Sequence, residues 1–259
     1  AAFADEWLTS LRRRSTTTAN YGITIEYAKR TFGRKYVGKL GAADVRRMLE
    51  LVEREHLERQ KPKPGEEPRA ISPTTLAKHL RQLATCLESA VAEGLLAKNP
   101  CKLLPKSQRP KPRKSKPAYF TDSELARLWP ELASRPVYLT TCKLAVTTGL
   151  RHGEIAGLMW GDVELVNGEL HLRRQFTAGE LVDVTKDNEP RTIDLVPAAR
   201  ALLEEWWKQT GDDGYVVENE LGGNLDASNT RKVLYAAMKC AGIDRIGERG
   251  GTRDFHSFR

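Results

Sequence analysis

The chain has 259 residues, of which 40% are hydrophobic, and this excludes disorder as the state of the whole chain while allowing one large domain or two ordinary ones. Its 42 lysines and arginines outnumber 34 acidic residues and give a net charge of +8, which favours a polyanionic partner. The sequence lacks a long apolar run and a signal-peptide pattern, and its four cysteines are scattered, so we expect a cytoplasmic protein without a membrane span, a disulfide framework or a zinc site.

Residues 1–104 have the periodicity of helices throughout. Apolar side chains recur at helical spacing in three stretches, which begin near Phe3, Leu40 and Leu76. The segment 61–70 is rich in proline and contains a glycine, which predicts a loop. We therefore expect a compact, all-helical first domain.

Residues 105–118 predict a linker between two domains. From position 102 to 116 the sequence holds seven lysines or arginines, three prolines and no acidic residue. Proline keeps such a segment extended, and like charges keep it from folding on itself. The same composition suits a path along DNA, where each neutralised phosphate releases counterions, with Lys111, Arg113 and Lys114 as candidate contacts.

Residues 119–259 predict a mostly helical second domain with a small sheet. Thr121, three residues before Glu124, forms a capping-box pattern that starts a helix, and Thr148–Gly149 interrupts a later helical stretch. The expected fold class is mainly α (α+β), a helical domain followed by a helical domain with a small three-stranded antiparallel sheet. Three alternating runs predict that sheet as a meander: 169–176, 181–186 and 191–196.

The stretch around Arg151 can carry chemistry. Because Arg151 follows the break at Thr148–Gly149, its guanidinium and the main-chain N–H groups of the restarting helix would point to one place, which suits a phosphate. Glu154, one turn later, can hold that arginine in a fixed rotamer. From spacing alone, an ordinary ion pair on a helix surface is the simpler interpretation.

Resemblance changes this interpretation. The run T-G-L-R-x-x-E-I-x-x-L-x-W-x-D-V around Arg151 closely resembles the first arginine motif of the tyrosine recombinases, also called the phage integrase family. His256 and Arg259 resemble the family's H-x-x-R box, and Lys186 lies at a strand-to-strand turn where the family places its catalytic lysine. The helical first domain resembles the family's core-binding domain, so the resemblance covers nearly the whole chain.

The resemblance implies site-specific recombination of double-stranded DNA through a 3′-phosphotyrosyl intermediate, without a metal or nucleotide cofactor. Arg151 and Arg259 would stabilise the charge on the pentacoordinate phosphate. Lys186 would protonate the leaving 5′-oxygen, and His256 would bind the phosphate and assist proton movement at the nucleophile. A bacterial or phage-encoded recombinase acting as a tetramer on paired DNA sites is implied, in integration, excision or resolution.

Several further side chains are candidates for DNA contact. Thr75, Lys78 and Arg81 follow one another at three-residue steps on the polar face of a predicted helix, and the equivalent helix of the family approaches the major groove. Candidates for contacts with the DNA backbone from the second domain are Lys143, Arg191 and either Arg173 or Arg174.

The family's nucleophile is a tyrosine downstream of the H-x-x-R box, and all seven tyrosines of this sequence lie upstream of His256. We therefore expect residues 1–259 to bind DNA without forming the covalent link, and to be monomeric or weakly assembled in the absence of the family's C-terminal segment. A recombinase that continues past Arg259 fits this pattern, and the sequence leaves open whether an arm-binding domain, which many integrases carry, precedes residue 1. Two alternatives remain: a DNA-binding or regulatory protein that has lost cleavage, and a type IB topoisomerase, against which the helical first domain and the first arginine motif argue.

Overall fold

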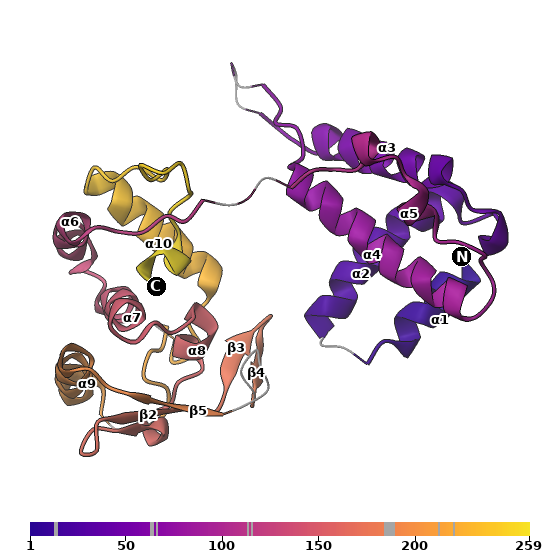
Figure 1. Cartoon of the computed structure of the whole chain (residues 1–259). Coiled ribbons are helices and arrows are strands. Elements are labelled where there is room, and N and C mark those ends of the chain that lie inside the picture. Colours follow the sequence, from indigo (N-terminus) through magenta and orange to yellow (C-terminus); the bar gives the residue numbers. More distant parts are fainter. Residues whose placement is uncertain are drawn as a thin grey trace. The chain divides into compact units, whose positions relative to one another are not determined.

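The computed structural model describes residues 1–12, 15–62, 65, 67–112, 114, 116–183, 190–211, 213–219 and 221–259. The chain divides into two compact units, Ala1–Lys114 and Ser115–Arg259, and each is considered by itself (Figure 1). The division falls inside the segment 105–118, which the sequence marks as a linker. The fold is mainly helical with a small antiparallel sheet, and this confirms the predicted fold class.

In the described residues of the first unit the regular structure is helical, because each of the longer helices buries an apolar stripe in a shared core. The Ser72 hydroxyl accepts the Thr75 N–H at 3.1 Å and starts one of these helices, with Pro73 in its first turn. Met48 and Leu83 are among the core side chains. The helices are α1 (Ala2–Ser10), α2 (Ser15–Phe32), α3 (Ala42–Glu58), α4 (Pro73–Ala92) and α5 (Pro100–Leu103), with single 3₁₀ turns at Val37–Lys39 and Lys106–Gln108.

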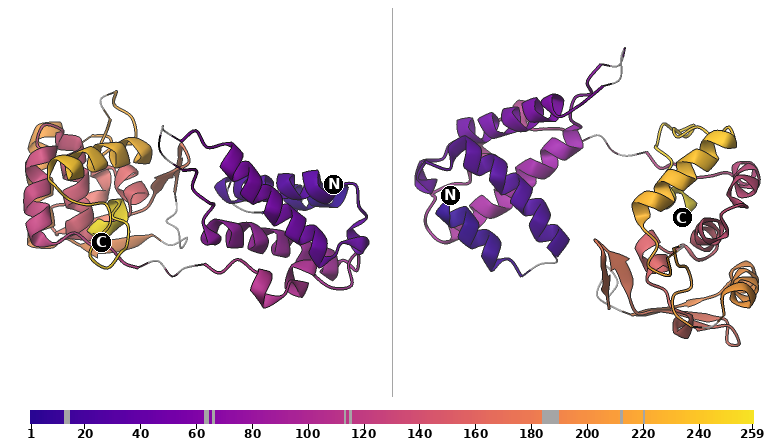
Figure 2. Two further views of the ribbon diagram at one scale, coloured as in Figure 1. Left: turned by 90° about the horizontal axis from the view of Figure 1, so that it is seen from above. Right: turned by 180° about the vertical axis from the view of Figure 1, so that it is seen from behind.

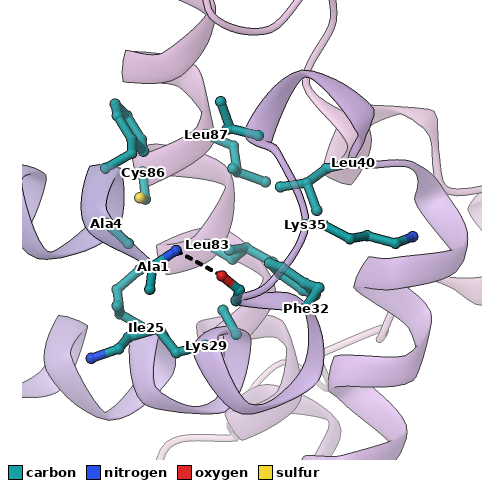
Figure 3. Close-up of a pocket in the computed structure, with 14 residues that line it drawn as sticks. Ala1, Ala4, Ile25, Lys29, Phe32, Lys35, Leu40, Leu83, Cys86 and Leu87 are labelled. Carbon is teal, nitrogen blue, oxygen red and sulfur yellow. Dashed lines mark hydrogen bonds between the residues drawn. The ribbon is translucent and has the colours of Figure 1, made fainter.

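A small cavity of about 50 Å³ lies in the first unit, lined mainly by apolar side chains of α1, α2 and α4 (Figure 3). The Ala1 amino group donates to the carbonyl oxygen of Gly33 at its edge, at 3.0 Å. Lys29 and Lys35, which also line the cavity, form ion pairs with neighbouring aspartates. Burial raises the pKa of Cys86 to about 12, so this thiol stays protonated at neutral pH. The cavity therefore offers apolar surface rather than reactive groups.

Helices also make up most of the second unit. The predicted capping box opens the first of them: the Thr121 hydroxyl accepts the Glu124 N–H at 3.3 Å, and Glu124 Oε2 accepts the Thr121 N–H at 2.9 Å. The helices are α6 (Asp122–Leu132), α7 (Pro136–Thr148), α8 (His152–Ala156), α9 (Pro197–Thr210) and α10 (Ala227–Cys240), with 3₁₀ turns η3 (Trp160–Asp162) and η4 (Phe255–Phe258). The turn η4 packs on α7, and Figures 1 and 2 show the C-terminal residues beside α7 and α10.

The sheet has three antiparallel strands, in the order β1 (Val163–Glu164), β2 (Glu169–Leu172) and β5 (Arg191–Asp194). A separate hairpin is formed by β3 (Gln175–Thr177) and β4 (Glu180–Val182). The predicted membership of the sheet is therefore wrong. The sequence predicts the run 181–186 as the middle strand, but β2 is the middle strand, β1 is an additional edge strand, and Leu181 and Val182 belong to the hairpin. The run 169–176 is divided between β2 and the hairpin. The reason lies at Arg173 and Arg174, which both reach the buried carboxylate of Asp162, at 3.5 and 3.3 Å, so that the chain leaves the sheet there.

Two glycines of α8 and its C-terminus allow the hairpin to lie against this helix (Figure 1). A Cβ atom on Gly157 would stand 2.8 Å from the Cα of Gln175, and one on Gly153 would stand 2.6 Å from the carbonyl oxygen of Phe176. The hairpin turns at Ala178 and Gly179, whose φ angles of 53° and 84° are those a type I′ turn needs. Among the described residues, no helix has the length and apolar character that crossing a membrane requires.

Candidate functional site

Arg151 lies at the junction that the sequence predicts between two helices. Helix α7 ends at Thr148 because Gly149 adopts a left-handed conformation with φ of 68°, and α8 begins at His152. The Arg151 main-chain N–H donates to Glu154 Oε2 at 2.8 Å, and its Nη1 donates to Glu154 Oε1 at 2.9 Å. Glu154 therefore occupies the Arg151 main-chain N–H, while the Arg151 side chain remains about one third exposed.

Glu154 is a fully buried carboxylate that joins two arginines. Arg191 comes from β5 and donates from Nη2 to both carboxylate oxygens at 3.1 Å. Burial by itself would raise the pKa of Glu154, but the hydrogen bonds from Arg151 and the charge of Arg191 outweigh it and hold the pKa below its usual value. The carboxylate therefore stays ionised and fixes both guanidiniums in place.

The H-x-x-R box forms the turn η4, which alternates buried and exposed side chains. Phe255 and Phe258 are buried, and Phe258 stacks on Phe120 with ring centroids 4.6 Å apart. His256 and Arg259 are exposed between and after these anchors. Arg259 Nε donates to the carbonyl oxygen of Gly149 at 2.6 Å, two residues before Arg151. The structure thus brings Arg259 to the segment that carries Arg151.

His152 is a further side chain at this site that the sequence analysis missed. Its Nε2 lies 2.9 Å from the hydroxyl of Thr230, and this hydroxyl donates its own proton to the Asp226 carbonyl oxygen, so Nε2 must carry the proton of the pair. Burial lowers the pKa of His152 to about 4; Asp226 acts in the opposite direction, and the nearby His256 adds to the lowering. His152 is therefore a neutral imidazole at pH 7, and its ring lies nearly perpendicular to that of Phe255, with the ring centroids 5.1 Å apart.

The three arginines considered for contacts with the DNA backbone all bind buried carboxylates. Arg191 binds Glu154, whereas Arg173 and Arg174 bind Asp162. Arg174 also contacts the sulfur of Met159. Arg173 remains the most exposed, with 54% of its side chain accessible.

In the first unit, the candidate side chains Thr75, Lys78 and Arg81 are exposed on α4, opposite its buried leucines. Thr75 also shares a 2.8 Å hydrogen bond with the hydroxyl of Ser72. Lys78 Nζ donates to Asn20 Oδ1 of α2 at 2.6 Å. The polar face that the sequence predicts is therefore present on this unit.

The remaining candidates lie in or near the connecting segments. Lys186 and Arg113 lie outside the described residues. Lys111 and Lys114 are exposed in the linker, and Lys143 is half-buried on α7. The described chain on either side of the position of Lys186 is the end of the β3–β4 hairpin and the start of β5.

One group of side chains in the described part of the chain has the composition and spacing of a metal site: Glu164, Glu169 and His171 on the β1–β2 pair. The His171 ring nitrogens already bind Thr192 at 3.0 Å and Glu164 at 2.9 Å. Since His171 pairs with Thr192 and not with Arg191, this group lies on the face of the sheet opposite Arg191. It is not part of the arginine site.

Comparison with known proteins identifies the family to which this chain is similar. Residues 119–259 match the phage integrase family. A tyrosine recombinase XerC-like protein of Caldanaerobacter subterraneus is 27% identical over 68% of this chain and 51% of its own length. The prophage integrase IntR of Escherichia coli K12 is 31% identical over 62% of this chain and 38% of its own length. The chain thus spans about half or less of these relatives.

Solved structures share the fold. A lambda integrase (75–356) dimer bound to a COC′ core site has a TM-score of 0.71 at 18% identity, covering 100% of this chain and 83% of that one. The Tn1549 transposon integrase in complex with transposon right end DNA has a TM-score of 0.76 at 13% identity, covering 99% and 82%. The family match alone covers more than half of the sequence, and this protein therefore belongs to the phage integrase family of tyrosine recombinases.

Proposed function

We propose that this protein is a site-specific recombinase that cleaves and rejoins double-stranded DNA through a 3′-phosphotyrosyl link. The observation that carries the proposal is that residues of the two predicted motifs meet at the α7–α8 junction. Arg151 starts α8, Arg259 binds the carbonyl oxygen of Gly149, and His256 adds to the lowering of the His152 pKa. Membership in the phage integrase family supports the same activity.

Two arginines at one place suit a phosphodiester. When a tyrosine oxygen attacks the phosphorus and the 5′-oxygen leaves, negative charge accumulates on the non-bridging oxygens. The permanently charged, planar guanidiniums of Arg151 and Arg259 meet that charge with paired N–H donors. Because Glu154 and the Gly149 carbonyl already fix these two side chains, little reorganisation is needed during the reaction.

Proton transfers fall to two other side chains. The tyrosine must lose its proton to become a nucleophile, and the leaving 5′-oxygen must gain one. We assign the second step to Lys186, on the connection between β4 and β5, because a lysine beside bound DNA donates a proton readily once its pKa is lowered. His256, exposed on η4, would hydrogen-bond the phosphate and assist the first step.

The nucleophile is not among the seven tyrosines of residues 1–259 in this proposal, since each of them precedes His256 in the sequence. Residues 1–259 alone would therefore bind DNA without forming the covalent link. We also propose a tetramer on paired sites for the active form, supported by the fold it shares with a lambda integrase tetramer bound to a Holliday junction, and weaker assembly for residues 1–259 alone.

DNA binding by both units and the linker completes the proposal. The polar face of α4 would enter the major groove, and the basic linker would follow phosphates. A bacterial cytoplasm, where DNA sites are accessible, is the proposed location. The proposed contacts are Thr75, Lys78, Arg81, Lys111, Arg113, Lys114 and Lys143.

A nicked suicide substrate tests the activity. The full-length gene product is incubated with a nicked duplex selected by the protein from a randomised library, and the covalent protein–DNA complex is counted on a denaturing gel. We expect a covalent complex with wild type, and one that forms about 10²- to 10³-fold more slowly with Arg151→Ala, because that is the cost of one missing charge-stabilising donor. Specific binding without any covalent complex would instead support the regulatory alternative, and relaxation of supercoiled DNA lacking the site would support a topoisomerase.

The role of Lys186 has its own test. A substrate with sulfur in place of the leaving 5′-oxygen departs without protonation, because a thiolate is a far better leaving group than an alkoxide. Lys186→Ala should therefore be nearly inactive on the normal substrate and close to wild type on the sulfur substrate. Arg151→Ala serves as the control and should remain defective on both.

A further inference from the structure

Arg253 is a buried cation close to the H-x-x-R box, and the proposed function leaves it without a role. Only 5% of the residue is exposed. Its Nη2 donates to Glu124 Oε1 at 2.6 Å, and its Nε donates to the Tyr119 carbonyl oxygen at 3.2 Å. Its Nη1 donates to the carbonyl oxygens of Asp244 and Ile246, at 2.9 and 3.3 Å. One guanidinium therefore ties residues 119–124 to the stretch 244–253.

Glu124 connects this cation to the start of α6. Its second oxygen, Oε2, accepts the Thr121 N–H at 2.9 Å and completes the capping box. The same carboxylate thus fixes the first turn of α6 and neutralises Arg253, and its side chain is itself only 15% exposed. A buried pair of this kind is held by its geometry, since removal of either partner leaves an uncompensated charge.

Further contacts fasten the last residues to the segment that enters the second unit. The Phe120 N–H donates to the carbonyl oxygen of Ser257 at 3.4 Å, and the ring of Phe120 stacks on Phe258. Gly251 packs so closely that a Cβ atom there would stand within 2.9 Å of the Pro117 carbonyl group. Residues 244–259 and residues 117–124 therefore behave as one packed piece, with Arg253 at its centre.

We propose that Arg253 is a positioning residue: through Glu124 and the main-chain carbonyls, it fixes the turn that carries His256 and Arg259 relative to Arg151. This inference rests on the proposed recombinase function. Arg253 is the third residue before His256, so a change in the path of its backbone shifts the imidazole and the Arg259 guanidinium together. Displacements of about 1 Å in a reacting assembly are enough to cost about 100-fold in rate.

The chemistry of the site requires arginine. Its four partners lie in different directions, and only a planar guanidinium presents donors to all of them at once. Lysine would keep the charge and the bond to Glu124, but it would lose hydrogen bonds to the main-chain carbonyl oxygens of Tyr119, Asp244 and Ile246. Arg253→Lys is therefore a sharp test of geometry at constant charge.

The experiment compares wild type, Arg253→Lys, Glu124→Gln and the double variant in the full-length gene product. The probe is the nicked duplex selected for binding by the wild type. Two quantities are measured at 25 °C: the dissociation constant, and the single-turnover rate of covalent complex formation at saturating protein. A merely structural role would lower the melting temperature and the active fraction, but would leave the rate constant of the folded molecules unchanged.

We expect dissociation constants within about threefold of wild type and a rate about 100-fold lower for Arg253→Lys. Glu124→Gln keeps an oxygen for the capping box and should show a smaller loss of about 10-fold. The double variant should be no slower than Arg253→Lys alone, because the two side chains act as a unit. Arg245→Lys is the matched control: this arginine lies in the same loop, exposed over the ring of Tyr235, and its variant should cleave like wild type.

Rates within twofold of wild type for both single variants, with wild type cleaving normally, would overturn the positioning role and leave the proposed function intact. Losses that appear only in the dissociation constant would overturn it as well. A wild type that binds its duplex but never forms the covalent complex would overturn the proposed function and this inference with it. Hydrogen exchange gives an independent check: the amides of residues 254–259 should exchange faster in Arg253→Lys than in wild type, and equal exchange would contradict the inference.

Discussion

Replacement of Glu154 by glutamine removes one charge from the centre of the site without changing its volume. In wild type the buried carboxylate receives the Arg151 main-chain N–H, one Arg151 guanidinium N–H and the Nη2 group of Arg191. Glutamine has one oxygen to accept hydrogen bonds, and its NH₂ group would face a donor. Two guanidiniums would then lie beside a neutral amide, with their mutual repulsion uncompensated.

The expected cost follows from these contacts. Removing one partner of a buried ion pair costs about 3 to 5 kcal/mol, and a lost hydrogen bond to a charged group costs about 1.5 to 3 kcal/mol. We therefore expect Glu154→Gln to lower the free energy of unfolding of the second unit by about 3 kcal/mol at pH 7. Urea unfolding followed by tryptophan fluorescence suits the measurement, because four of the five tryptophans belong to this unit.

The pH dependence gives a second check on the same variant. The pKa of Glu154 is held below its unfolded value, so its contribution is complete above about pH 4.5 and is lost as the pH falls through the folded pKa. The difference between wild type and Glu154→Gln should shrink in the same range. Glu205→Gln is the matched control, since this carboxylate is exposed and pairs with Lys208 at 3.3 Å; its effect should stay below about 0.5 kcal/mol. A Glu154→Gln effect equally small at pH 7 would refute the reasoning.

Three other predictions concern stability and DNA binding. Because the pKa of His152 is lowered from 6.5 to about 4, the free energy of unfolding should rise by up to about 3 kcal/mol as the pH rises between these values. Urea unfolding at successive pH values should show this contribution in wild type and not in His152→Asn. Gly157→Ala should cost about 1 to 3 kcal/mol in the same assay, because its Cβ atom would meet the backbone of β3, whereas Gly161→Ala has open space and should be nearly neutral. Replacing Lys111 and Lys114 together by alanine should reduce the slope of log K against log salt by about 1.8 in fluorescence anisotropy of a duplex; an unchanged slope would remove the linker from the DNA contacts.

The parts of the site that the sequence predicted are local in the chain. The break at Gly149, the bond between Arg151 and Glu154, and the capping box at Thr121 each depend on residues within three or four positions of one another. Such patterns follow from helix geometry and the conformational freedom of glycine, which act regardless of the surrounding fold.

The parts that the sequence could not predict join distant residues. Arg191 and Glu154 are 37 positions apart, His152 and Thr230 are 78 apart, and Arg253 and Glu124 are 129 apart. Neither periodicity nor spacing reports such pairs. The alternation of residues 169–176 likewise predicted one continuous strand. The pattern could not show that the strand would end at Arg173 and Arg174, where both side chains bind the buried Asp162.

The central claim is that Arg151 stabilises negative charge on the scissile phosphate. Its most direct test compares the normal duplex with one in which a neutral methylphosphonate replaces that phosphate, using wild type and Arg151→Ala in single-turnover formation of the covalent complex. The account predicts that Arg151→Ala lowers the rate at least about 100-fold on the phosphate and less than about 10-fold on the methylphosphonate, whose pentacoordinate state carries one negative charge fewer. An equal loss on both substrates would contradict it.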